Sequence, residues 1–142
     1  MIDRAVRAKL LSVAAIAAAV GGTGAGARVW VNELPQSPTP KWPAITYQLI
    51  SGRPEYTLSS TAGVAEVRIQ IDCWSGRRED VSAYDEVRDL AELVRGALSA
   101  FKGTSDGVVI QSCFLVGRRV LSDDETGTDR ESLDFLVSYT EA

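Results

Sequence analysis

The chain has 142 residues, of which 45% are hydrophobic and 24% are charged, and this is the composition of one globular domain. It excludes a disordered, collagen-like or disulfide-stapled chain. Histidine is absent, which removes the commonest general base, the commonest metal ligand and every Ser-His or Cys-His catalytic pair. The 15 basic and 19 acidic residues give a net charge of −4, which does not favour nucleic-acid binding.

Charge is divided unevenly along the chain. Residues 1–71 carry a net charge of +3, whereas residues 72–142 carry a net charge of −7. Two differently charged faces suit a chain that binds copies of itself. Two solvated surfaces without such a role would give the same count.

The N-terminal residues have the pattern of an amphipathic helix. Apolar residues recur every three or four positions between Ile2 and Val20, and Asp3 is placed to cap the first turn. The glycine pair at 21–22 supplies a stop. This pattern predicts a helix over residues 1–20.

The same stretch allows a second interpretation, in which residues 1–27 are a secretion signal. Basic residues precede an alanine-rich run, and the small residues at 25–27 resemble a cleavage site. In this alternative the chain is an exported bacterial envelope protein, and Cys73 and Cys113 form a disulfide.

Residues 21–43 form a connector rich in glycine and proline. Four of the five prolines lie between Leu34 and Pro43, which predicts an extended connection rather than a regular element. Within the connector, residues 28–31 are expected to form one short strand.

Two strands are expected next, over residues 44–51 and 64–74, because apolar and polar residues alternate in both. In the second strand Trp74 falls on the polar face. The alternation predicts a buried face made of Val67, Ile69, Ile71 and Cys73. Residues 52–63 are too many for a tight turn, and we expect them to project as a loop.

The strongest helical pattern covers residues 80–101, with an apolar stripe from Tyr84 to Phe101 and a cap at Asp80 or Ser82. Two further strands are expected over residues 107–121 and 131–141. Between these strands, residues 122–129 form an acidic tip, expected to be disordered or to await a partner.

These elements predict a two-layer α+β fold in one domain over residues 1–142. The domain would consist of the N-terminal helix 1–20, the connector 21–43, and residues 44–142, which hold the main sheet and the long helix 80–101. An antiparallel or mixed sheet of four to five strands is expected to be covered on one face by the two helices.

The sequence contains no arrangement of residues that indicates catalysis or the binding of a metal or cofactor. Cys73 and Cys113 lie on predicted strands without further metal ligands, and they are interpreted as small buried hydrophobic residues. The acidic tip lacks the spacing and the closing glutamate of a calcium-binding loop. We therefore expect neither a cofactor nor an enzyme.

Several residues have the character of an interaction surface. Aromatic and arginine side chains, which are enriched at interface centres, occur in and beside the expected loop and at the end of the following strand. They could equally cover a sheet edge or solvate a loop. Together with two residues of the acidic tip, the candidate contact residues are Arg53, Tyr56, Trp74, Arg77, Arg78, Asp123 and Asp124.

One part of the sequence resembles a known family. Residues 43–58 read PAITYQLISGRPEYTL, residues 63–74 read GVAEVRIQIDCW, and an amphipathic helix follows. This order is similar to that of the tail-completion or tail-terminator proteins of long-tailed bacteriophages, over residues 43–101.

The resemblance implies a small α+β subunit that forms a hexameric ring in the virion, after assembly in the host cytoplasm. The ring would end the tail tube and join the tail to the head. Its partners would be the tail-tube protein and the head–tail connector proteins, and DNA would pass through its channel without specific binding. Another neck protein or a tube-related subunit with the same ring habit is a further alternative.

Overall fold

The computed structural model describes residues 2–24, 26–32, 41–56, 61–79, 81–123 and 125–141, with the backbone alone considered at 51–56, 61–64 and 141. One mixed sheet organises these residues, and its strands lie in the order β1-β2-β3-β6-β5-β4. The bounds of the strands are β1 Val29–Val31, β2 Ala44–Tyr56, β3 Thr61–Gly76, β4 Gly103–Ser105, β5 Val108–Asp123 and β6 Thr128–Glu141. The short strand β1 pairs parallel to β2, and every other neighbouring pair is antiparallel.

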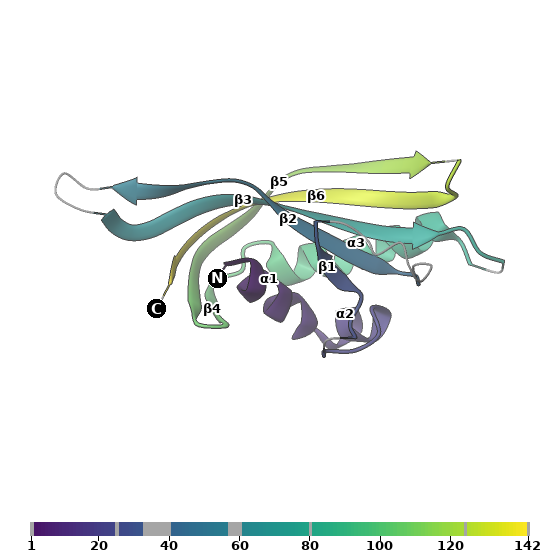
Figure 1. The fold of residues 1–142 in the computed structure, drawn as a ribbon, viewed down its shortest axis with the longest axis horizontal. Coiled ribbons are helices and arrows are strands. Elements are labelled where there is room, and N and C mark those ends of the chain that lie inside the picture. Colours follow the sequence, from purple (N-terminus) through teal and green to yellow (C-terminus); the bar gives the residue numbers. More distant parts are fainter. Residues whose placement is uncertain are drawn as a thin grey trace.

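Three helices lie on one side of this sheet and leave the other side uncovered (Figure 1). Their bounds are α1 Ile2–Leu11, α2 Ala14–Ala19 and α3 Ala83–Leu98. The α+β class and the two layers are thus as predicted. The strand number is not, because the sheet has six strands instead of four to five.

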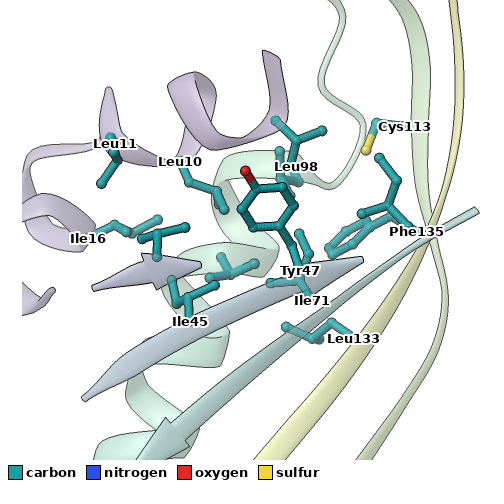
Figure 2. Packing of buried hydrophobic residues seen from close by; sticks show 14 of the residues in the cluster. Leu10, Leu11, Ile16, Ile45, Tyr47, Ile71, Leu98, Cys113, Leu133 and Phe135 are labelled. Carbon is teal, nitrogen blue, oxygen red and sulfur yellow. The ribbon is translucent and has the colours of Figure 1, made fainter. Parts of the chain in front are cut away.

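The hydrophobic core fills the space between the helices and the covered face (Figure 2). Leu10 from α1 and Leu98 from α3 meet Tyr47 and Phe135 from the sheet. The predicted alternation on β3 is confirmed, since its four apolar residues Val67, Ile69, Ile71 and Cys73 are all buried. Eight core residues come from the first 27: Ile2, Ala5, Val6, Leu10, Leu11, Ile16, Val20 and Ala27.

Both predicted helices are shorter than expected. The N-terminal pattern is split at Ser12 and Val13, where the chain leaves the helix before α2 begins. The long helix runs over Ala83–Leu98, with the Ser82 side chain accepting a hydrogen bond from the Asp85 backbone N–H. Tyr84 was expected in the buried apolar stripe of this helix. It is instead 50% exposed at the start of α3, beyond the core.

The loop predicted over residues 52–63 is wrong where the structure describes these positions, and residues 57–60 lie outside the described chain. Residues 52–56 continue β2 and residues 61–63 belong to β3, and the backbone pairs Arg53 with Glu66 and Tyr56 with Thr61. Residues 51–56 and 61–66 therefore form a β-hairpin arm, which extends beyond the helices (Figure 1). The glycine, proline and serine residues favoured a loop, but pairing between the two strands overrides that local preference.

The acidic tip is also more regular than expected. Strand β5 continues through Asp123 and β6 starts at Thr128, so that only a short turn joins them. The Asp123 carboxylate accepts hydrogen bonds from the backbone N–H groups of Thr126 and Glu125, and these bonds lower the pKa of the Asp123 carboxyl. Asp124 lies outside the described residues.

The disulfide predicted by the secretion alternative is not present. Cys73 pairs with Glu131 on β6, and Cys113 pairs with Val137, six residues farther along the same strand. This register separates the two cysteines by about 20 Å along the strand direction. A disulfide needs Cα atoms within about 7 Å, and both thiols are free and buried.

We expect neither cysteine to react with iodoacetamide in the native protein at pH 8. Burial raises the pKa of the Cys113 thiol to about 12, and it raises the pKa of the Cys73 thiol as well. Both groups are therefore protonated as well as inaccessible to reagent. Mass spectrometry should find both cysteines alkylated in denaturant and neither in buffer. Native alkylation of either cysteine at the rate of free glutathione would contradict this burial.

Candidate interaction surface

The uncovered face of the sheet carries a polar network centred on Trp74. The indole Nε1–H of Trp74 on β3 donates to Thr46 Oγ1 at 2.9 Å. The Arg130 guanidinium lies over the Trp74 ring, 4.8 Å from its centroid, and within 3.8 Å of the Asp72 carboxylate. Gln70 donates to both carboxylate oxygens of Asp72 at 3.1 Å. The face is therefore held rigid by contacts between neighbouring strands rather than by a covering layer.

A shallow hollow of about 510 Å³ opens beside Trp74. Its lining combines this aromatic ring with polar groups from the β5–β6 turn, and consists of Trp74, Leu121, Ser122, Asp123, Glu125, Thr128 and Arg130. Two of the candidate contact residues, Trp74 and Asp123, thus line the same surface depression.

Arg77 and Arg78 lie just after β3, near this end of the sheet. The Arg77 guanidinium is 3.8 Å from Asp129, and its backbone N–H donates to the carbonyl of Gly127 at 2.7 Å. The Arg78 guanidinium binds Glu86 on α3 and donates to the carbonyl of Trp42 at 3.3 Å. Both arginines therefore tie the end of β3 to neighbouring segments.

The other two candidates lie at the opposite end of the molecule. Arg53 and Tyr56 are on the hairpin arm, and about 40 Å of β3 separates the tip of the arm from Trp74. The structure thus brings Trp74, Arg77 and Asp123 to one end of the sheet and places Arg53 and Tyr56 at the other.

The sequence analysis missed a set of exposed apolar residues at the two edges of the sheet. On the β1–β2 edge Val31 is 49%, Leu49 49% and Ile50 48% exposed. On the open part of the β5 edge Phe114 is 55% and Val116 50% exposed, and Val109, beside β4, is 36% exposed. Alternation alone cannot find them, because it does not show where the covering helices end or which strand lies at an edge.

The backbone is also unpaired along parts of these two edges. Among the described residues, β1 pairs with β2 only at Ile45–Tyr47, so the outer side of β2 has no strand partner from Leu49 onward. Strand β4 pairs with β5 only at Val108–Ile110, and the Cys113 carbonyl accepts one further bond from the Ala100 N–H at 2.8 Å. From Phe114 to Asp123 the outer side of β5 has no strand partner in the described chain.

Comparison with known protein families identifies a matching family model. The family model described as tail completion protein gp17 matches residues 4–140. The chain belongs to this family. It is thus a structural protein of a phage tail, as the resemblance over residues 43–101 implied, and the match extends to nearly the whole chain.

A solved structure shares the fold of this family member. A chain of the structure titled "Virion of native gene transfer agent (GTA) particle" matches with a TM-score of 0.71 at 15% sequence identity. The match covers 98% of this chain and 94% of that chain. A search of curated proteins gave no match.

The part of this tail completion family member that the structure describes contains neither a metal-binding group of side chains nor a membrane-spanning helix. No group of three or more cysteine, aspartate or glutamate side chains there is arranged to hold a metal ion. No helix in those same ranges has the length and apolar character needed to cross a membrane.

Proposed function

We propose that the chain is a virion subunit that forms a ring at the end of the tail tube. The ring ends tube assembly and joins the tail to the head connector, after the subunits have folded in the host cytoplasm. The observation that carries this proposal is the family match over residues 4–140. A structural tail family also suggests that the chain is not an enzyme.

The shape of the subunit supports a ring. A ring of identical subunits needs two different surfaces on each copy, which meet head to tail and close by rotation. The sheet offers such a pair, because one edge is formed by β1 and β2 and the other by β5. Six is the copy number that the resemblance implies.

The hairpin arm is the part of the subunit best placed to reach a partner. It extends beyond the helix layer, so its residues are far from the core of their own chain (Figure 1). In the proposed ring the arm contacts the tail-tube protein or a neighbouring subunit through Arg53 and Tyr56. The opposite end, with Trp74, Arg77, Arg78 and Asp123, is then available to meet the connector.

The charge of the subunit fits a channel through which DNA slides. The net charge is −4, and the uncovered face carries Arg68 and Arg130 beside Asp72 and Asp134 rather than a basic stripe. Specific or tight DNA binding requires clustered lysine and arginine residues. DNA therefore passes the ring without specific binding.

The test supplies the protein in trans to a phage from which this coding sequence has been deleted. The wild-type chain should restore tails of normal length that are joined to heads. A chain with Arg53→Ala and Tyr56→Ala should fold but should restore far fewer joined particles, because the arm no longer holds its partner. Electron microscopy of the particles measures both outcomes.

Two outcomes would count against these proposals. If the wild-type chain has no effect on tail length or on joining, the proposed function is wrong. If the doubly substituted chain restores joined particles as well as the wild type, the arm is not the contact. Circular dichroism of the purified variant serves as the folding control.

A further inference from the structure

The exposed apolar residues of the two sheet edges lie on different faces of the sheet. Leu49 pairs with Ile69 and Val31 pairs with Tyr47, so both share the helix-covered face, beyond the reach of the helices. Phe114 pairs with Leu136, which alternates with the buried Phe135 and Val137 and so lies on the uncovered face.

Irregular pairing in β2 and β5 involves one of the exposed apolar residues on each strand. The register of β2 shifts between Leu49 and Ser51, and that of β5 shifts between Leu115 and Gly117. Ile50 and Val116 are the residues skipped at these shifts, and both are about half exposed. A β-bulge turns a side chain away from the regular ladder, and here it presents an apolar group to solvent at each edge.

We infer that the β1–β2 edge of one copy of this chain overlaps the β5 edge of the next copy. This inference rests on the proposed ring and identifies the contact that builds it. The first edge carries Val31 and Leu49 on the helix side, and the second carries Phe114 on the uncovered side. The helix side of the β1–β2 edge of one copy can therefore lie on the uncovered side of the β5 edge of the next copy, with the two sheets oriented in the same direction.

The chemistry of the two patches favours a second copy over other partners. Each patch is apolar, so water is excluded when the two patches meet in this overlap. Overlap between β1–β2 and β5 uses both patches of every copy and continues around a ring. Contact between two β5 edges would stop at a dimer and leave Val31, Leu49 and Ile50 exposed.

The test uses one charged substitution on each edge. Leu49→Lys should disable the first edge and Phe114→Lys the second. Sedimentation velocity over a wide concentration range should show the wild type associating beyond a dimer. Each variant alone should associate at least about tenfold more weakly, because a lysine replaces a buried contact at the interface.

Mixing the two variants gives the decisive result. The Leu49→Lys chain keeps an intact β5 edge, and the Phe114→Lys chain keeps an intact β1–β2 edge. An equal mixture should therefore form dimers, and no larger species, with the affinity of one wild-type contact. Tyr84→Lys is the matched control, because Tyr84 is 50% exposed and lies on α3 rather than on an edge strand, and this variant should associate as the wild type does.

Three results would overturn the inference: a wild type that stays monomeric at every concentration, a mixture that stays monomeric, or a Leu49→Lys chain that still dimerises by itself. These results leave the proposed function to be decided by tail restoration in the deleted phage. Conversely, edges that bind each other in a protein that restores no tails would uphold the inference and reject the function.

Discussion

Replacing Ile69 with aspartate is expected to leave the protein unfolded. Ile69 is 1% exposed in the middle of β3, between Leu49 on β2 and Phe135 on β6. Loss of the isoleucine side chain alone costs about 2–5 kcal/mol, and an unpaired carboxylate in the same place adds to this cost. A domain of this size is stable by only about 5–15 kcal/mol. Far-ultraviolet circular dichroism and thermal unfolding measure the result.

Leu49→Asp is the matched control for this substitution. Leu49 lies directly across from Ile69 on the same face but is 49% exposed, so its aspartate remains in contact with water. This variant should fold and unfold cooperatively close to the wild type. A soluble Ile69→Asp protein with a native spectrum and a cooperative transition would mean that the assigned faces of β3 are reversed.

The second large effect is expected at Arg118, which neutralises a buried carboxylate. Glu131 on β6 is 0% exposed, and its Oε2 accepts a hydrogen bond from Arg118 Nε at 2.8 Å and a second from Arg118 Nη2. Its Oε1 has one ion-pair partner, Arg88 on α3, at 3.1 Å without hydrogen-bond alignment. Arg118 also binds Glu92 on α3 at 3.0 Å, so it joins β5 to both neighbours.

Arg118→Met should lower the free energy of unfolding by about 3–5 kcal/mol, because it leaves the charge of Glu131 buried with one poorly aligned partner. Urea unfolding measures this loss. Arg95→Met is the control, because the Arg95–Glu92 pair is exposed and such pairs contribute about 0–1 kcal/mol. Arg118→Met combined with Glu131→Leu should recover much of the loss. An Arg118→Met chain as stable as the wild type would show that the ion pairs of Glu131 contribute little to stability.

The layers of the fold could be predicted where burial is uniform along an element. On β3 a period of two identifies the buried face, because α1 and α3 cover its apolar residues from Val67 to Cys73. The prediction failed where pairing or coverage changes along an element. Gly52 and Pro54 favoured a loop, yet β3 pairs with them, and Tyr84 fits the helical stripe but lies beyond the edge of the core.

The candidate surface could be predicted in part. The types of their side chains made Trp74 and Asp123 candidate contact residues. The structure places both in the lining of one hollow, although they are 49 positions apart in the sequence. That they lie together depends on β6 pairing with both β3 and β5, which no local pattern reveals. The apolar edges were missed because Leu49 and Phe114 have the same sequence pattern as buried residues of the same strands.

The hairpin arm has a consequence for how related tails can diverge. Its strands pair with each other and extend beyond the helices, so an insertion there lies outside the helix-covered core (Figure 1). Two residues added to each strand would lengthen the arm by about 7 Å and keep every side chain on its original face. One residue added to each would turn those side chains over. The reach of the arm can therefore change in even steps, without redesign of the domain that carries it.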